Sequence, residues 1–276
     1  MTFVPGTALP SSSTAARSVY AVGKRGLLAR RDDATGDWTL PSEEDVRALG
    51  FATDDAHYLG AHDDRDALAI EIPDAFVPDG GFSLLGLRTL VEAFDEETFA
   101  VAGRASHVLD WATTSRFCGR CGTPTERVAH ERCMKCPRCA LALYPRIAPA
   151  VIVLVRRGEQ ALLARNARFP LPFYSTLAGF SDVGETLEDT VVRELREEVG
   201  VCVKSPRYVG SQPWPFPNSL MIAFTAEWES GDIVVDQDEI AEAAWFSRDQ
   251  LPMVPPPISI ARRMIDAWVN EVAKSQ

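Results

Sequence analysis

Four glutamates and one arginine follow one another at spacings that suit a divalent-metal site. They stand at Glu185, Arg193, Glu194, Glu197 and Glu198. At about 100° per residue, Glu194, Glu197 and Glu198 project together along one edge of a helix. Crowded carboxylates repel one another unless a cation neutralises them, and hard oxygen ligands suit Mg²⁺ or Mn²⁺. The pattern predicts a divalent-metal site. The alternative, a solvated acidic helix face, fits Glu188 and Asp189.

The residues around these carboxylates predict the helix that has to position them. Thr186 and Asp189 form a capping pair at its start, and Gly200 is a natural C-terminal stop. Apolar residues recur on one side of it, at Leu187, Val191, Val192, Leu195 and Val199. We therefore expect a helix that packs this side on a core and carries the glutamates along its edge.

Cysteine spacing predicts a zinc site. Five of the six cysteines lie between residues 118 and 139, where two CxxC pairs offer the ligands Cys118, Cys121, Cys136 and Cys139. Four thiolates at this spacing form a closed tetrahedral site, which is structural rather than catalytic. Cys133 forms a further CxxC with Cys136 and leaves the ligand set open, although we favour Cys139 over Cys133. A redox pair is the weaker alternative.

An unusual apolar loop follows the glutamate helix. Residues 211–219 read Ser-Gln-Pro-Trp-Pro-Phe-Pro-Asn-Ser. The three alternating prolines hold the aromatic side chains in a stiff, extended loop. Such a loop either lines a ligand pocket or is hidden in a core or an interface.

Together these features resemble a known family. The string GxxxxxE, seven residues, then REUxEExGU, with U apolar, is complete from Gly179 to Val201 and is the signature of Nudix hydrolases. With the loop SQPWPFPNS and the four-cysteine ribbon, the chain resembles the NADH pyrophosphatase family. The resemblance covers roughly residues 99–265 closely and the N-terminal half only loosely.

The resemblance implies a reaction and its ligands. Water attacks the pyrophosphate of NADH or NAD⁺ to give AMP and nicotinamide mononucleotide, and some members also remove NAD caps from RNA 5′ ends. Mg²⁺ or Mn²⁺ would be held by Glu194, Glu198, Glu239 and the carbonyl of Ala178. Glu197 would bind metal or position water, and the identity of the catalytic base stays open. The family is typically a homodimer whose pocket borrows residues from both subunits.

The resemblance also assigns substrate contacts, residue by residue. The dinucleotide pocket would be lined by Gln212, Pro213, Trp214, Pro215, Phe216, Pro217, Asn218 and Ser219. Glu131, Tyr144 and Ala261 match further ligand positions, and Arg88 matches one across a one-residue insertion. Phe180 would stack on the nicotinamide ring, or else pack in the core. Arg193 fits a structural partner of Glu185 better than a phosphate ligand.

Composition limits the number of domains and the classes of binding partner. A chain of 276 residues with 46% hydrophobic and 24% charged residues has room for about two domains with cores. A net charge of −11 disfavours general nucleic-acid or membrane binding, and no apolar run reaches membrane-spanning length. We therefore expect a cytoplasmic protein without a membrane partner.

The expected fold class is α+β. We place an N-terminal α+β domain over 1–114, the zinc ribbon over 115–143, and a Nudix α/β/α sandwich with a mixed sheet over 144–276. Strands are expected at 18–22 and 67–72, and helices at about 85–93 and 96–113. From 148 on we expect strand, strand, loop, helix, strand, strand and a final helix. No internal repeat is visible.

Two other functions remain to be weighed. One is a broader Nudix hydrolase that acts on ADP-ribose or other dinucleotides, against which the SQPWPFP loop speaks. The other is a non-catalytic module that binds nucleotides or RNA through the zinc ribbon. The complete set of glutamates argues against this second alternative, as does the acidic net charge.

Overall fold

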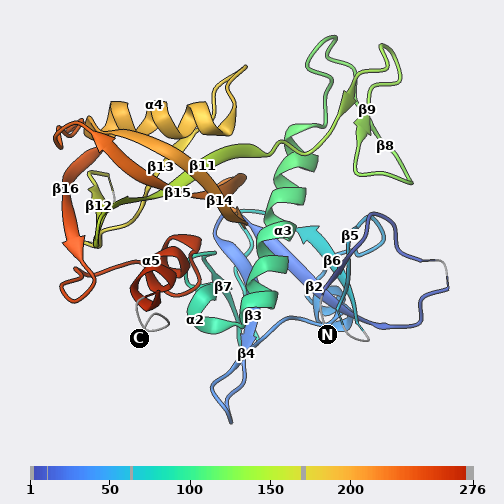
Figure 1. The fold of residues 1–276 in the computed structure, drawn as a ribbon. Coiled ribbons are helices and arrows are strands. Elements are labelled where there is room, and N and C mark those ends of the chain that lie inside the picture. The colour runs from blue at the N-terminus through green and yellow to red at the C-terminus, as the bar shows by residue number, and fades with distance from the viewer. Residues whose placement is uncertain (1–2, 11, 63–64, 169–171, 272–276) are drawn as a thin grey trace. The chain divides into compact units, whose positions relative to one another are not determined.

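The computed structural model describes residues 3–10, 12–62, 65–168 and 172–271. The chain divides into two compact units, residues 1–146 and 147–276 (Figure 1). Among the described residues, no helix is both long and apolar enough to cross a membrane. The three-domain division expected from the sequence stays a prediction.

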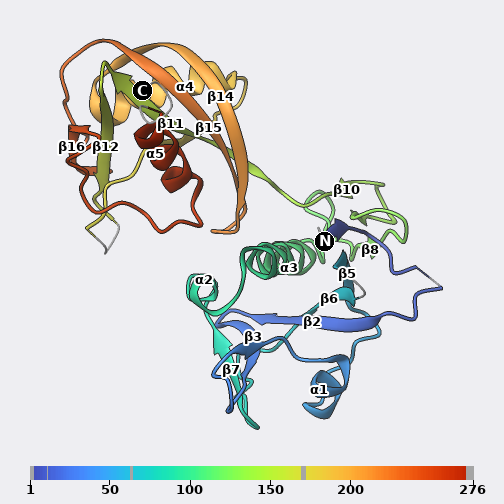
Figure 2. The ribbon, with the colours of Figure 1, turned by 60° about the horizontal axis from the view of Figure 1, so that its bottom comes forward.

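The first unit is built on a seven-stranded sheet in the order β1-β5-β6-β2-β3-β4, with β7 paired to β3. Its strands are β1 (Val4–Pro5), β2 (Ala16–Gly23), β3 (Gly26–Arg31), β4 (Trp38–Thr39), β5 (His57–His62), β6 (Arg65–Glu71) and β7 (Phe82–Leu85). Its helices are α1 (Glu43–Ala48), α2 (Leu90–Ala93) and α3 (Glu96–Thr114). Figure 2 shows α3 on one face of the sheet and α1 on the other.

Most predicted elements of this unit are confirmed, and one is wrong in part. Strands β2 and β6 contain the runs expected at 18–22 and 67–72, and α3 is the expected helix. The side chain of Asp95 caps α3 by accepting a hydrogen bond from Thr98 N. The helix expected at 85–93 is limited to α2, because residues 82–85 pair with β3 instead. Pairing between distant segments overrides a local helical pattern there.

A small ribbon completes the first unit. Strands β8 (Glu126–Arg127), β9 (Met134–Lys135) and β10 (Ala142–Leu143) form an antiparallel sheet in the order β10-β9-β8. Helix α3 holds the end of the ribbon, since Trp111 Nε1 donates to the carbonyl of Leu143 at 3.1 Å. The same helix contacts the end of the unit through His107 Nε2, 2.6 Å from the carbonyl oxygen of Arg146.

The second unit is a mixed sheet between two helices. Its strand order is β14-β15-β11-β12-β16, with β13 paired to β11. The elements are β11 (Ala148–Arg157), β12 (Gln160–Asn166), β13 (Leu177–Phe180), α4 (Leu187–Val199), β14 (Cys202–Trp214), β15 (Ser219–Ser230), β16 (Ile240–Ser247) and α5 (Ile260–Asn270). Two of these strands, β13 and β16, were not expected from the sequence.

Alternation along β11 divides the core of this unit into two layers. Val151 and Val153 pack with the apolar face of α4, whereas Ile152 and Leu154 pack with α5. Strands β11 and β15 run parallel, while the other pairings in the sheet are antiparallel. The α/β/α sandwich with a mixed sheet is therefore confirmed.

The two units share one topology, which the sequence did not reveal. The order β5-β6-β2-β3-β7 in the first unit corresponds to β14-β15-β11-β12-β16 in the second. In both, the central pair is parallel, β2 with β6 and β11 with β15. The helix at the position of α4 is the short α1, whose sequence Glu-Glu-Asp-Val-Arg-Ala lacks the spacing of Arg193, Glu194, Glu197 and Glu198. Only the second unit therefore carries the acidic motif.

Candidate active site and zinc site

Helix α4 positions the carboxylates as its sequence predicts. Thr186 Oγ1 accepts a hydrogen bond from Asp189 N at 3.1 Å, and Gly200 ends the helix at a φ of 73°. Val191, Leu195 and Val199 are fully buried against the sheet. With this side fixed, Glu194 and Glu198 lie along the edge of the buried stripe, whereas Glu197 is exposed.

Glu198 is the most constrained of these glutamates. It is 7% exposed, and within the described part of the chain its Oε2 atom is buried without a hydrogen-bond partner. Burial, reinforced by the charges of Glu194 and Glu239, raises the pKa of Glu198 to about 8. Burial also raises the pKa of Glu194, despite its contact with Arg193. The site thus has an unmet demand for positive charge.

The loop before β16 brings further carboxylates to the same place. Asp236 N donates to the carbonyl of Glu198 at 2.9 Å, which ties the loop to the end of α4. Glu239 follows in a turn, with its N 3.1 Å from the carbonyl of Asp236 and its own carbonyl accepting from Ala167 N at 2.8 Å. These bonds place Glu239 within the electrostatic field of Glu194 and Glu198, as their raised pKa values record.

Strand β13 lies directly against Glu194. A Cβ atom built on Gly179 would lie 1.9 Å from Cδ of Glu194, so the carboxylate occupies the space that any other residue would fill. Ala178 precedes Gly179 in the same strand. The unpartnered oxygen, the raised pKa values and the oxygen-only donors of Glu194, Glu198 and Glu239 fit a hard divalent cation.

Arg193 connects the motif. Its guanidinium donates to Glu185 through Nε–Oε1 at 2.5 Å and Nη2–Oε2 at 2.8 Å, which confirms the predicted partnership. It also donates to Oε1 of Glu194 at 2.8 Å, to Oε2 of Glu197 at 3.0 Å and to the carbonyl of Phe180 at 2.8 Å. The bond from Arg193 lowers the pKa of Glu185 to about 2. One side chain thereby orients three carboxylates and the end of β13.

The ribbon gathers the four favoured cysteines. Sγ atoms of Cys118, Cys121, Cys136 and Cys139 all lie within 4.8 Å of one another. No other group of three or more His, Cys, Asp or Glu side chains in the described residues is this tight. Cys133 is buried but lies outside the cluster, so the open choice between Cys133 and Cys139 falls to Cys139.

The two halves of the cluster have equivalent backbones. Gly122 N donates to the carbonyl of Cys118, and Ala140 N donates to the carbonyl of Cys136. Gly122 and Ala140 both have positive φ, 70° and 58°. The N–H groups of Arg120 and Cys139 point at sulfur, each at 3.4 Å. Paired knuckles of this kind fit a structural Zn²⁺ with four thiolate ligands.

The sequence matches three family models in chain order. Residues 16–111 match an NADH pyrophosphatase-like rudimentary NUDIX domain, residues 113–144 an NADH pyrophosphatase zinc ribbon domain, and residues 146–269 a NUDIX domain. The chain is 49% identical over 251 residues to a protein of Pseudomonas putida named NAD-capped RNA hydrolase NudC, across 91% of this chain and 86% of that one. The chain belongs to the NADH pyrophosphatase family of Nudix hydrolases.

A second relative and one solved structure are also similar to this chain. A Pseudomonas aeruginosa protein, also named NAD-capped RNA hydrolase NudC, is 51% identical over 189 residues, 68% of each chain. A crystal structure of a NUDIX hydrolase from Nitrosomonas europaea aligns with a TM-score of 0.49 at 20% identity, over 57% of this chain and 93% of that chain. The match of residues 16–111 to a rudimentary NUDIX domain accords with the topology that the two units share.

In this family member, the predicted substrate loop is the end of a β-hairpin. Residues 212–219 comprise the end of β14, a four-residue turn and the first residue of β15. The rings of Trp214 and Phe216 lie 5.2 Å apart at 59°, and both are half-buried. Phe180 is 57% exposed at the end of β13, so the core-packing alternative is wrong for it. Its ring is free to meet a ligand.

Two of the predicted substrate contacts, Gln212 and Ala261, are buried within the second unit. Gln212 is buried, donates from Nε2 to the carbonyl of Ile258 at 2.8 Å and accepts from Ile260 N at 2.7 Å. Its amide therefore holds the start of α5 rather than presenting itself to solvent. Ala261, in the first turn of α5, is buried in the core at 4% exposure. Neither position offers an exposed polar group.

The remaining predicted contacts lie in the first unit. Tyr144 is 54% exposed and donates to Oε2 of Glu131 at 3.2 Å, so the structure brings these two together. This bond raises the pKa of Tyr144. Arg88 is exposed in the turn between β7 and α2. Sequence reasoning missed Asp236, whose charge acts on Glu198, and the contact of Gly179 with Glu194.

Proposed function

We propose that this protein hydrolyses the pyrophosphate of NADH and NAD⁺ to AMP and nicotinamide mononucleotide, and removes NAD caps from RNA 5′ ends by cleaving the same bond. The observation that carries the proposal is identity of 49% across 91% of the chain to a relative named for NAD-capped RNA hydrolysis. The carboxylates of Glu194 and Glu198 on α4 support it, because their raised pKa values fit the binding of a divalent cation. Hydrolysis of a pyrophosphate needs such positive charge beside the reacting phosphorus.

Within this proposal, Glu194, Glu198, Glu239 and the carbonyl of Ala178 would hold Mg²⁺ or Mn²⁺. A bound divalent ion would neutralise phosphate oxygens and make a bound water more acidic. The protein's own side chains orient the site: Arg193 fixes Glu194 and Glu197, and the exposed ring of Phe180 offers a flat apolar surface to a nicotinamide ring. The hairpin of residues 212–219 would line the dinucleotide pocket.

Other parts of the proposal concern the assembly. The four clustered cysteines fit a structural Zn²⁺ that stabilises the ribbon. Glu131, Tyr144 and Arg88 would contact substrate, in a homodimer whose pocket takes residues from both subunits. We keep the cytoplasm as the expected location.

A competition assay tests the activity. Purified protein would be given Mg²⁺ or Mn²⁺ with NADH, ADP-ribose and NAD-capped RNA, and the products separated by chromatography. We expect preferential release of AMP and reduced nicotinamide mononucleotide from NADH, and loss of roughly a thousandfold or more of this activity in Glu198→Gln. Glu188→Gln, an exposed glutamate on the same helix, is the matched control. Wild-type turnover in Glu198→Gln would refute the site, and faster cleavage of ADP-ribose would refute the substrate.

A further inference from the structure

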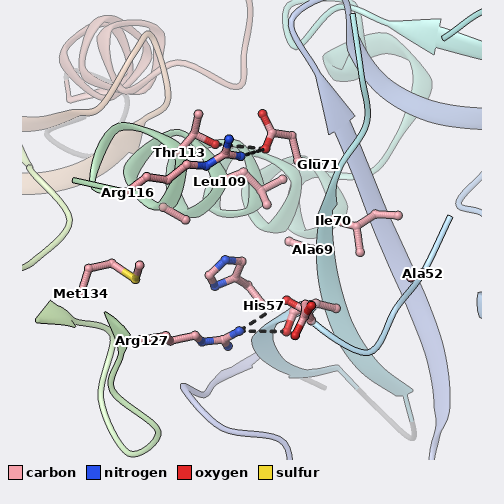
Figure 3. Close-up of a pocket in the computed structure, with 13 residues that line it drawn as sticks. Ala52, His57, Ala69, Ile70, Glu71, Leu109, Thr113, Arg116, Arg127 and Met134 are labelled. Atoms are coloured by element: carbon pink, nitrogen blue, oxygen red, sulfur yellow. Dashed lines mark hydrogen bonds and ion pairs between the residues drawn. The ribbon is translucent and has the colours of Figure 1, made fainter. Parts of the chain in front are cut away.

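A cavity of about 400 Å³ lies in the first unit, and residues of that unit alone line it. Strands β5 and β6, the C-terminal half of α3 and the ribbon strands β8 and β9 enclose it (Figure 3). Cavities of this volume are typical of small-molecule sites. The mechanism proposed above uses none of its lining residues.

The walls of the cavity are largely apolar. Ala69 and Ile70 come from β6, Leu109 from α3, and Met134 from β9. Met134 is only half-buried, and its flexible thioether suits the face of a flat ring. Together these side chains offer two opposed apolar surfaces, one on the sheet and helix and the other on the ribbon.

The charged side chains at the cavity differ in their hydrogen-bond and ion-pair partners. Glu71 is neutralised within the fold, since it accepts from Arg116 Nη2 at 2.7 Å and from Thr113 Oγ1 at 3.2 Å. Among the described residues, Arg127 instead donates to carbonyl oxygens, of Asp55 at 3.5 Å and Ala56 at 3.3 Å. Asp55 itself is exposed, so solvent weakens its attraction for Arg127.

Two more guanidinium groups, of Arg104 and Arg132, are coupled electrostatically to Arg127 or to each other, although neither lines the cavity. Arg132 is directed at the backbone, donating to the carbonyls of Gly6 at 2.6 Å and Tyr58 at 3.0 Å. Burial lowers the pKa of Arg127, Arg104 and Arg132, and the charges of Arg104 and Arg127 lower that of Arg132 further. In the stretches of chain that the structure describes, none of the three forms an ion pair with a carboxylate. Of the three, Arg127 is the one that lines the cavity.

His57 adds a polar group at the centre. Figure 3 shows its ring between α3 and the strand that carries Arg127. Its Nδ1 atom is buried, and no hydrogen-bond partner for it exists among the described residues. Burial, with the charges of Arg127 and Arg132, lowers the pKa of His57 to about 4. The neutral ring therefore adds no positive charge at neutral pH, and it leaves one nitrogen unsatisfied.

We propose that this cavity binds a small, flat organic anion of mononucleotide size. Its planar body would lie between Met134 and Leu109, and its phosphate or carboxylate would pair with Arg127. An anion there would supply a countercharge to Arg127, and a polar edge of the ligand would satisfy His57. Nucleoside monophosphates have this chemistry, and so do aromatic carboxylates.

Binding can be read at the cavity itself. In full-length protein with ¹³C-methyl methionine, the Met134 signal, assigned with Met134→Leu, would be followed during titration with AMP, nicotinamide mononucleotide, benzoate or inorganic phosphate. If the ligand is a nucleoside monophosphate, we expect AMP or nicotinamide mononucleotide to shift the Met134 signal saturably. If the ligand is an aromatic carboxylate, we expect benzoate to do so. Phosphate alone should shift it weakly. Turnover plays no part in this readout, so it stands whether or not the proposed hydrolysis is confirmed.

Variants test whether the charge of Arg127 contributes to ligand affinity. Arg127→Gln should weaken the affinity about tenfold or more, whereas Arg120→Gln, an exposed arginine of the same ribbon outside the cavity, should leave it unchanged. Ala52→Trp, at an exposed position on the rim, should block binding without removing a charge. The proposal is overturned if no probe shifts Met134 up to about 10 mM, or if Arg127→Gln binds as tightly as the wild type.

Discussion

Arg193 donates a hydrogen bond of 2.8 Å from Nη1 to Oε1 of Glu194, one of the proposed metal ligands, while its Nε and Nη2 hold both oxygens of Glu185. The planar fork of the guanidinium makes these bonds at the same time, which a lysine ammonium group does not reproduce. Arg193 therefore orients a ligand without binding the metal itself.

We expect Arg193→Lys to raise the Mg²⁺ concentration for half-maximal NADH hydrolysis by about tenfold or more, because Glu194 loses its fixed orientation. Titration of activity with Mg²⁺ measures this directly. Arg196→Lys, on the exposed side of the same helix, serves as the control and should behave as wild type. Equal Mg²⁺ dependence in the two variants would show that Arg193 has no orienting role.

Gly179 gives a second way to move Glu194. A methyl group at this position would lie 1.9 Å from Cδ of Glu194, and the end of that flexible side chain is free to yield. We expect Gly179→Ala to stay folded but to lose about a hundredfold in kcat, since the carboxylate is displaced by an ångström or more. Circular dichroism and steady-state kinetics separate the two effects. Gly210→Ala is the matched control, because a Cβ atom there meets nothing within 4 Å; comparable losses in both variants would count against the steric cause.

The ribbon offers a test of zinc ligation. We expect about one Zn²⁺ per chain in the wild type, and its loss in Cys136→Ser together with a lower melting temperature, because structural zinc contributes folding energy. Cys133→Ala removes a buried thiol outside the cluster and should keep its zinc. Atomic absorption on the purified proteins gives the answer. Loss of zinc from Cys133→Ala, with retention in Cys136→Ser, would reverse the assignment.

Local signals made part of the site predictable from the sequence. The caps at Thr186 and Gly200 and the apolar side of α4 are properties of one continuous segment, so the direction of Glu194 and Glu198 followed from helical periodicity. The zinc cluster followed in the same way from short spacings around tight turns. Both predictions depend only on residues close together in the sequence.

Long-range pairing decided what the sequence did not predict. The charge of Asp236 helps to raise the pKa of Glu198, and its backbone N–H donates to the carbonyl of Glu198 at the end of α4, although no local pattern pointed to this residue. The amide of Gln212 also bonds to backbone groups at the start of α5, a contact across 46 residues or more that no local pattern predicts. The shared topology of the two units is likewise invisible in residue patterns, because α1 lacks both the length and the glutamates of α4.

The raised pKa of Glu198 predicts how stability depends on pH in protein free of Mg²⁺ and Mn²⁺. A carboxyl group whose pKa rises from 4.5 unfolded to about 8 folded is most favourable when protonated, so its contribution to stability falls as pH increases between these values. Glu198→Gln is neutral throughout. We therefore expect the variant to be more stable than the wild type by roughly 5 kcal/mol at pH 9, with the difference vanishing toward pH 4.5.

Urea denaturation of both proteins across this pH range, with zinc retained, measures the difference. Added Mg²⁺ should stabilise the wild type and leave Glu198→Gln unchanged, since a ligand that binds only the folded state raises its stability. Glu188→Gln, exposed on the same helix, should follow the wild type at every pH. A variant less stable than the wild type at pH 9 would mean that another group of the protein compensates the charge of Glu198. The raised pKa of Glu198 would then no longer support a cation site.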